Sequence, residues 1–438
     1  MGRHHAFLGG GAQGGARPRR AMAPLPTADT LLESGFWERL CPGLRVGRGA
    51  ESGGRLPGGG SPTVCPAQIR DAMKQRGYAE VGPGEMASPR EIAGLAAGVE
   101  ALEAAGWPAT FILVFDETWD LLERMRKSVI GSPSSAGGSS GCPNVPNLDV
   151  LAWKVDPSKG QLGFSPHRDR QPVDVPGSFH PNGTARYFTG WLALSDATVH
   201  NSCLYCLPRA ADPGYDSGDL DNVDPLARAL SSKDSYQNIR ALPCSAGASV
   251  VFTHRLIHWG SGGNGAGGAH SVKFGSPGTG PAPPPPRLAL AAAFSDPDFE
   301  PPYFSLDLLP QPPLHMRVAL AAAQMIAYYQ RFEVSASQLR LFRELFERHQ
   351  SKFHPTYRQK VLSELVGAST EAAARAAREG DDEDSEDVLD EALERVLDAE
   401  ADEGGGFDDD FDLAQTSSEE EDQGQDEDEA GPAKKRKI

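Results

Sequence analysis

Short apolar runs separated by Gly, Pro, Asn and Asp fill residues 148–300, and this pattern constrains the fold most strongly. The clearest runs are "DVLAWKV", "RYFTGWLAL", "NSCLYCLP", "ASVVFTH" and "RLALAAAF". Short strands with frequent turn signals favour a β-sandwich or a jelly roll. One helix-like segment, "DPLARALSSKDSYQNIR", is expected to connect two of the strands.

Helical patterns flank this β-rich region on both sides. The stretch "PAQIRDAMKQRGYAEV" predicts a helix followed by a strand, and "ETWDLLERMRKSVI" predicts a helix. In "SPREIAGLAAGVEALEAAG", Ser88 is the expected N-cap, Pro89 the first helical residue and Glu91 the partner in a capping box. We expect "ATFILVF" to be a buried strand. Downstream, "LHMRVALAAAQMIAYYQRF" and "SASQLRLFRELFERHQSKFH" predict helices that cover the sheets.

The net charge of −18 is concentrated in residues 381–430, where Arg395 is the single basic residue, so the remaining chain is close to neutral. A near-neutral body gives no basic patch for nucleic acid, and nucleic acid is not an expected partner. The acidic tail is expected to be disordered, and the alternative is that it binds a basic partner protein. The final "PAKKRKI" is either a nuclear localisation signal or a solubilising terminal charge run.

No apolar run reaches the length of a membrane span, so no membrane-spanning segment is expected. The six cysteines lack a disulfide-framework spacing, which indicates a reducing, intracellular compartment, nuclear or cytoplasmic. Cys203 and Cys206 form a CxxC that we interpret as two buried thiols. The N-terminal stretch contains arginine and no acidic residue, so an organellar transit peptide is the alternative to a Gly-rich leader.

The stretch "GFSPHRDRQP" places His167 and Asp169 two residues apart. On an extended chain residues i and i+2 project from the same face, so both side chains can reach one metal ion while Arg168 points away. One more histidine would complete a facial triad of two histidines and a carboxylate, which binds Fe(II) and leaves coordination positions open. An HxD pair also arises by chance, and a surface turn is the alternative interpretation.

Two further polar side chains follow apolar runs downstream. In "ASVVFTHRLIHWGSGGN", His254 and His258 compete as the third ligand, and we favour His258 because small residues begin just after it. Arg287 opens the run "RLALAAAF". A buried arginine requires an anion, and a planar guanidinium suits a carboxylate; the alternative is an exposed residue at a loop end.

The order of these motifs resembles the phytanoyl-CoA dioxygenase family over roughly residues 77–301. The resemblance rests on "GFSPHRDRQP", "TGWLALSDATVHNSCLYCLP" and "VVFTHRLIHWGSGGN". It implies a double-stranded β-helix (a cupin-like jelly roll) with Fe(II) bound by His167, Asp169 and His258. It also implies that 2-oxoglutarate is the co-substrate, with its distal carboxylate on Arg287, and that Ser261 and Trp191 contact it. The segment between His258 and Arg287 is longer than is usual in the family.

The implied activity is that of a non-haem Fe(II)- and 2-oxoglutarate-dependent dioxygenase that uses dioxygen to hydroxylate a C–H bond of a small-molecule or lipid-like substrate. Two alternatives stay open: a nuclear scaffold protein without turnover, and an oxygenase that acts on a protein. The polar neighbours that could contact a substrate, or else lie on the surface, are Lys154, Arg170, Tyr187 and Asn201.

The expected organisation is therefore a mainly β chain with N- and C-terminal helices, divided into four parts. Residues 1–66 form a disordered leader, and residues 67–312 form the dioxygenase domain. Residues 313–366 form a C-terminal helical extension, and residues 367–438 form a disordered acidic tail that ends in the basic cluster.

Overall fold

The computed structural model describes residues 25–47, 65–131, 144–170, 177–220, 223–260, 284–309, 311–332 and 334–379. Its strands are β1 (Tyr78–Val81), β2 (Val145–Val155), β3 (Tyr187–Ala193), β4 (Leu204–Leu207), β5 (Arg240–Leu242), β6 (Ser249–Thr253), β7 (Ile257–Gly260) and β8 (Arg287–Ser295). They form a five-stranded sheet in the order β1-β6-β3-β8-β2 and a three-stranded sheet in the order β5-β4-β7. Each of these strand pairs is antiparallel. The predicted two-sheet double-stranded β-helix is confirmed at this level.

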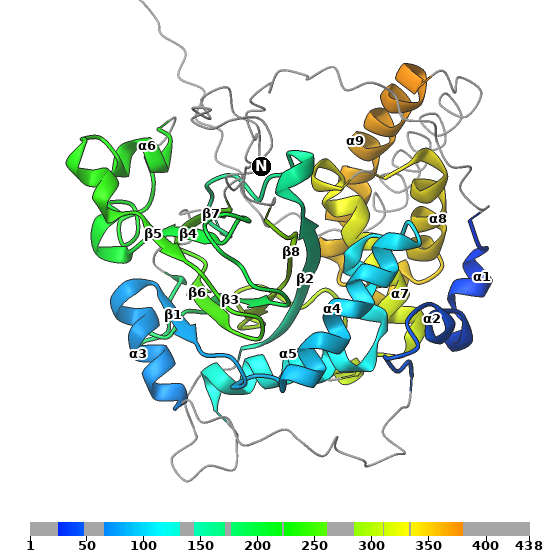
Figure 1. Ribbon diagram of the computed structural model, residues 1–438, viewed down its shortest axis with the longest axis horizontal. Coiled ribbons are helices and arrows are strands. Elements are labelled where there is room, and N and C mark those ends of the chain that lie inside the picture. Colours follow the sequence, from blue (N-terminus) through cyan, green and yellow to red (C-terminus); the bar gives the residue numbers. More distant parts are fainter. Residues whose placement is uncertain are drawn as a thin grey trace, which may run out of the picture.

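The helices surround the sheets and contain more residues than the strands do (Figure 1). The α-helices are α1 (Ala28–Leu31), α2 (Ser34–Leu40), α3 (Pro66–Arg76), α4 (Pro89–Ala104), α5 (Asp116–Ile130), α6 (Pro225–Ala229), α7 (Leu314–Ala327), α8 (Ala336–Glu347) and α9 (Pro355–Glu379). The short 3-10 helices are η1 (Ala109–Val114), η2 (Pro157–Lys159), η4 (Arg209–Ala211), η5 (Asp234–Asn238), η6 (Leu306–Leu308), η7 (Tyr329–Arg331) and η8 (Gln350–Lys352). The expectation of a mainly β chain therefore holds for the two sheets, but helices predominate among the described residues as a whole.

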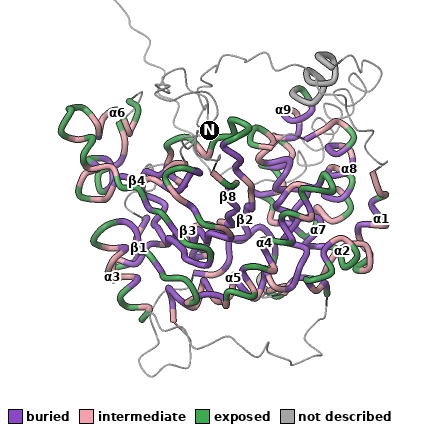
Figure 2. Tube along the Cα trace, viewed as in Figure 1, coloured by how far each residue is buried: buried purple, intermediate pink, exposed green. Residues whose placement is uncertain are grey.

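Side-chain alternation along the strands gives the larger sheet two buried faces. On β3, Phe188 and Leu192 join the cluster that the helices cover, while Trp191 and Ala193 face the space between the two sheets. This is the period-two pattern of a strand that is buried on both faces. Figure 2 shows the result as buried residues that run along the strands and through α7.

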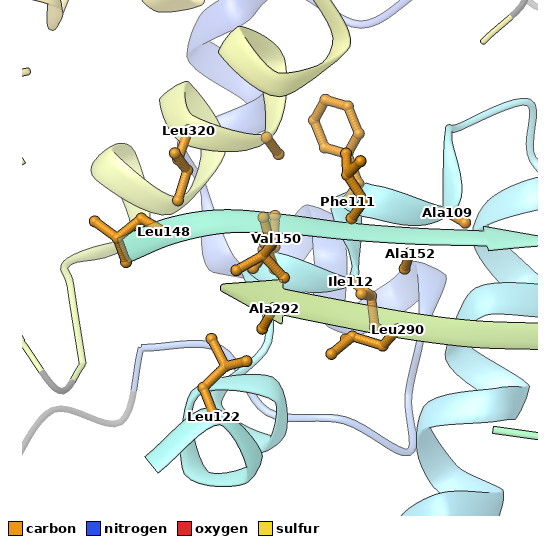
Figure 3. Close-up of a cluster of buried hydrophobic side chains, with 14 of the residues drawn as sticks. Ala109, Phe111, Ile112, Leu122, Leu148, Val150, Ala152, Leu290, Ala292 and Leu320 are labelled. Atoms are coloured by element: carbon orange, nitrogen blue, oxygen red, sulfur yellow. The ribbon is translucent and has the colours of Figure 1, made fainter. Parts of the chain in front are cut away.

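The cluster outside the larger sheet joins β2 and β8 to the helices. In Figure 3, Leu148, Val150 and Ala152 of β2 lie between Leu290 of β8 and Leu320 of α7. The helices α7, α8 and α9 pack on this side of the molecule, as predicted for a helical cap (Figure 1).

The predicted strand "ATFILVF" is wrong, because this run forms the buried 3-10 helix η1. A short apolar run does not distinguish a buried strand from a buried helical turn. Its backbone carbonyls find side-chain donors in α5: Thr118 Oγ1 donates to the Ile112 carbonyl and Trp119 Nε1 to the Leu113 carbonyl, each at 2.7 Å. These contacts satisfy groups that a sheet ladder would otherwise pair.

Two of the predicted boundaries are also wrong. Residues 25–47, assigned to a disordered leader, include α1 and α2, whose Leu31 and Trp37 are fully buried in the main core. At the other end, α9 continues to Glu379 rather than ending at 366. The remaining leader (1–24 and 48–64), the acidic tail from 380 and the basic cluster lie outside the described residues. Among the described helices, none has both the length and the apolar character needed to cross a membrane.

Candidate metal centre

The fold brings His167, Asp169 and His258 together at one end of the space between the sheets. Their ligand atoms all lie within 4.8 Å of one another. The Asp169 Oδ1 atom is 3.6 Å from His167 Nε2 and 3.5 Å from His258 Nε2. The structure thus brings together the three residues that the sequence indicated.

Backbone hydrogen bonds join the two segments that carry these side chains. The His167 N–H donates to the His258 carbonyl at 3.1 Å, and the His258 N–H donates back to the His167 carbonyl at 3.0 Å. This reciprocal pair forms an isolated antiparallel bridge between the loop that follows η2 and strand β7. The two imidazole rings consequently have centroids only 4.3 Å apart.

Both imidazoles present Nε2 to the centre because their Nδ1 atoms are already occupied. His167 Nδ1 donates to the Ser165 carbonyl at 2.7 Å, and His258 Nδ1 donates to the Leu256 carbonyl at 3.1 Å. A carbonyl only accepts, so in each neutral ring the proton is on Nδ1 and the Nε2 lone pair is free. Burial and the neighbouring His258 lower the pKa of His167 to about 4, so its ring is neutral at physiological pH. Neutral rings oriented through Nδ1 suit a metal ion.

The Asp169 carboxylate is held by Thr189, a residue that sequence reasoning missed. The Thr189 hydroxyl on β3 donates to Asp169 Oδ2 at 2.5 Å, which leaves Oδ1 directed at the two histidines. Thr189 lies on the same face of β3 as Trp191. The alternation of side chains along the strand could therefore have indicated that Thr189 faces the site.

Arg287 lies at the start of β8 and is fully buried, with 1% of its surface exposed. Its guanidinium lies over the rings of Trp153 and Trp191, with its Cζ 5.5 Å from each ring centroid. No hydrogen bond satisfies its Nε among the described residues. Burial lowers the pKa of Arg287 to about 10, so the side chain is still cationic at neutral pH. A buried cation with an unpaired donor is a fit for an anionic group.

The other residues named from the sequence have different places. Ser261 lies outside the described residues. His254, the rival third ligand, instead directs Nδ1 to the Tyr187 carbonyl at 2.8 Å and does not belong to the ligand cluster. The remaining neighbours contact protein groups as follows: Lys154 pairs with Glu100, Arg170 pairs with Glu300, Asn201 bonds the carbonyls of Asp196 and Pro285, and the buried Tyr187 packs against the His254 ring.

The CxxC cysteines are buried free thiols, as predicted. Burial raises the pKa of the Cys206 thiol to about 12, so it is protonated and unreactive at neutral pH. Cys203 lies close enough to Arg287 for the two to interact electrostatically. These thiols therefore line the core between the sheets.

Part of the chain matches a known protein family. Residues 109–269 match the sequence profile of the phytanoyl-CoA dioxygenase (PhyH) family, a range that contains all three clustered side chains and ends before Arg287. No sequence among the curated proteins matches the chain.

Several solved structures match part of this chain at low sequence identity. The non-haem α-ketoglutarate-dependent carbocyclase SnoK from nogalamycin biosynthesis is 17% identical, covers 54% of this chain and 87% of its own, and has a TM-score of 0.37. The epimerase SnoN from the same biosynthesis is 16% identical, with 53% and 80% covered and a TM-score of 0.32. AviO1 from Streptomyces viridochromogenes Tue57 is 19% identical, with 54% and 96% covered and a TM-score of 0.34.

The family match and the ligand cluster agree with each other. The matched range begins at η1 and runs past β7, so it includes both segments that carry the cluster. The clustered side chains are the two histidines and one carboxylate that hold iron in non-haem oxygenases. Residues 109–269 therefore resemble the phytanoyl-CoA dioxygenase family, and they contain the whole ligand cluster.

Proposed function

We propose that His167, Asp169 and His258 bind Fe(II), and that Arg287 binds the distal carboxylate of 2-oxoglutarate. We further propose that the enzyme uses dioxygen to hydroxylate a C–H bond of a small-molecule or lipid-like substrate. The observation that carries this proposal is the convergence of two bare Nε2 atoms and one carboxylate oxygen within 4.8 Å. A surface turn would not be expected to direct two histidine Nε2 atoms and a carboxylate oxygen toward one point.

When bound, Fe(II) with 2-oxoglutarate and dioxygen supplies an oxidation in which 2-oxoglutarate gives succinate and carbon dioxide and one oxygen atom goes to the substrate. The protein's part is orientation. The Ser165 and Leu256 carbonyls hold the two rings, and Thr189 holds the carboxylate. With three protein ligands, a bound iron would keep coordination positions for the co-substrate and dioxygen.

Arg287 and Trp191 form the proposed co-substrate end of the site. The guanidinium offers a fixed cation to a carboxylate, and the indole rings on either side exclude water from it. Ser261 is proposed as a further contact on the basis of family pattern alone. The carboxylate of Asp169 occupies the position that halogenating relatives leave to chloride, which favours hydroxylation.

Two alternatives involve the same three side chains. In the first the protein is a nuclear scaffold without turnover, and in the second it is an oxygenase that acts on a protein. The two histidine Nε2 atoms that face one carboxylate oxygen, and the buried Arg287 Nε that has no partner among the described residues, support an enzyme. The basic C-terminal cluster and the acidic tail, which suggested a nuclear location and a basic partner protein, lie outside the described residues.

The test is succinate formation from 2-oxoglutarate by the full-length protein with added Fe(II). We expect slow turnover without a substrate in the wild type and loss of that turnover in His167→Ala. The matched control is His254→Gln, which alters a buried histidine outside the ligand cluster and should retain turnover. Equal rates in wild type and His167→Ala would contradict the proposal. Screening metabolite pools with the active protein would then identify the substrate.

A further inference from the structure

Arg168, the residue between the two ligands of the HxD motif, belongs to a buried group of charges. Its side chain points away from the metal centre, as the strand alternation predicted, but it does not reach solvent. The side chains of Arg168, Asp212 and Asp219 are 3%, 0% and 12% exposed. Burial acts to lower the pKa of Arg168, but hydrogen bonds and charges from the two carboxylates outweigh it and raise the pKa above its usual value.

Every N–H donor of the Arg168 guanidinium has an acceptor. Nε and Nη2 donate to the two oxygens of Asp219 at 2.8 and 2.7 Å. Nη1 and Nη2 donate to the two oxygens of Asp212 at 2.6 and 3.0 Å. The remaining Nη1 donor goes to the backbone carbonyl of Arg255. A guanidinium has five such donors, so this contact set is complete.

These contacts join three separate segments of the chain. Arg168 stands between His167 and Asp169, and Arg255 lies three residues before His258. Asp212 and Asp219 lie in the segment that follows η4. Arg255 also donates from Nε to the Tyr215 carbonyl at 3.0 Å and from Nη2 to the Gly214 carbonyl at 3.3 Å. The segment from 212 to 219 is therefore bonded to both of the segments that carry ligands.

The packing around the guanidinium leaves no room for adjustment. A Cβ atom placed on Gly214 would lie 2.3 Å from Asp219 Oδ1 and 2.7 Å from Arg168 Nη2. The Gly214 N–H also donates to Asp212 Oδ1 at 2.9 Å. The segment from 212 to 219 is therefore packed closely against the Arg168 guanidinium.

We propose that Arg168 is a positioning residue that sets the distance between the His167–Asp169 pair and His258 by joining their segments through Asp212, Asp219 and the Arg255 carbonyl. This inference rests on the proposed metal site. The loop from 161 to 170 contains no regular strand, and three backbone hydrogen bonds join it to β7, so side-chain contacts add to what holds it in position.

The experiment measures Co(II) binding by the full-length, metal-free protein, the Co(II) absorption spectrum, and the stability of the metal-free form in denaturant. Arg168→Lys keeps the charge and removes the planar fork. The triple variant Arg168→Met, Asp212→Asn, Asp219→Asn removes the buried charges together, so no carboxylate is left unpaired. The control is Arg209→Met. It breaks the two-contact ion pair with Asp216, which lies in the segment from 212 to 219 but does not contact the loop from 161 to 170 through this pair.

We expect Arg168→Lys and the triple variant to bind Co(II) about ten- to a hundredfold more weakly, the range seen for residues that orient metal ligands, and to alter the Co(II) spectrum. The control should match the wild type in both. A folded triple variant that binds Co(II) within twofold of the wild type, with an unchanged spectrum, would overturn this inference alone. Failure of the wild type to bind Co(II) would overturn both this inference and the proposed metal site.

Discussion

One hydrogen bond orients each of the three candidate ligands. The bonds differ in the number of residues that separate the ligand from its partner in the sequence. The two histidine rings bond carbonyls two residues away, at Ser165 and Leu256. The carboxylate of Asp169 bonds Thr189, twenty residues away on β3. Their spacing in the sequence indicated His167 and Asp169 as candidate ligands, and the small residues that follow His258 favoured it as the third. Nothing in the sequence distinguished Thr189 from an ordinary strand residue.

Replacing Thr189 with valine should weaken metal binding without unfolding the protein. The hydroxyl bond to Asp169 Oδ2 is lost, while the shape of the side chain is nearly kept. We expect about a tenfold lower affinity for Mn(II), measured by calorimetric titration. The control is Thr253→Val, which removes a buried hydroxyl bonded to Tyr215 instead. Equal affinities for wild type and Thr189→Val would show that Asp169 needs no such support.

The stability of the metal-free protein should depend on pH through His254. This ring is fully buried, and burial lowers its pKa to about 4. The unfolded chain, with a histidine pKa near 6.5, takes up a proton that folded His254 excludes, so stability falls as pH drops from about 6.5 to about 4. The contribution is on the order of 3 kcal/mol across that interval.

Denaturant titrations at several pH values test this directly. The free energy of unfolding of His254→Gln should fall less between pH 7 and pH 4.5 than that of the wild type. Replacing the exposed His200 with glutamine should leave the wild-type slope unchanged. If His254→Gln and wild type lost stability in parallel, the buried ring would not be the source of the pH dependence.

At the scale of elements, the strands and the capped helix were predictable because their signals are local. Ser88 and Glu91 form the predicted capping box at the start of α4. The run that became η1 was not predictable, because its structure depends on donors from α5 rather than on its own apolar pattern. The partners of Arg168 were also missed, because they come from a loop 44 and 51 residues away.

The loop from 161 to 170, which carries His167 and Asp169, packs so closely on β7 that a side chain at Gly163 should not fit. A Cβ atom there would lie 2.6 Å from the Gly260 Cα, a backbone atom that cannot rotate away. Gly163→Ala should therefore push the loop off β7, destabilise the protein by about 1–3 kcal/mol and weaken metal binding. The control is Gly177→Ala, where a Cβ meets nothing within 4 Å. Thermal unfolding and Mn(II) titration of both variants provide the measurement, and equal behaviour would contradict so close an approach of the two backbones.

On the scale of the whole molecule, the oxygenase core and its flanking helices share one hydrophobic cluster. Trp37 of α2 stacks on Phe111 of η1, with ring centroids 5.6 Å apart, and Phe111 in turn contacts Phe342 of α8 at 5.3 Å. Elements from near both ends of the described chain therefore pack against the same central turn. The stretch "LLESGFWERL" is visibly amphipathic in the sequence, but its local pattern does not show that Trp37 packs against Phe111, more than seventy residues away.

Deletion of residues 1–47 should consequently destabilise the entire protein. The deletion removes Leu31 and Trp37, both fully buried, and exposes the aromatic cluster that they cover. Losing a buried tryptophan alone costs about 3–5 kcal/mol. The comparison is deletion of residues 1–24, which removes none of the described elements. Chemical denaturation should separate the two truncations by at least that amount, and identical stabilities would contradict this contribution of α1 and α2 to the core.

The most direct test of the metal site is the visible charge-transfer absorption that Fe(II) gives when 2-oxoglutarate chelates it, recorded without oxygen. We predict that the wild-type protein shows this absorption and that His258→Ala does not. We predict that Arg287→Gln shows it only at about ten- to a hundredfold higher 2-oxoglutarate, since one charge-assisted contact is lost. Absence of the absorption in the wild type, or its persistence in His258→Ala, would contradict the proposed iron site.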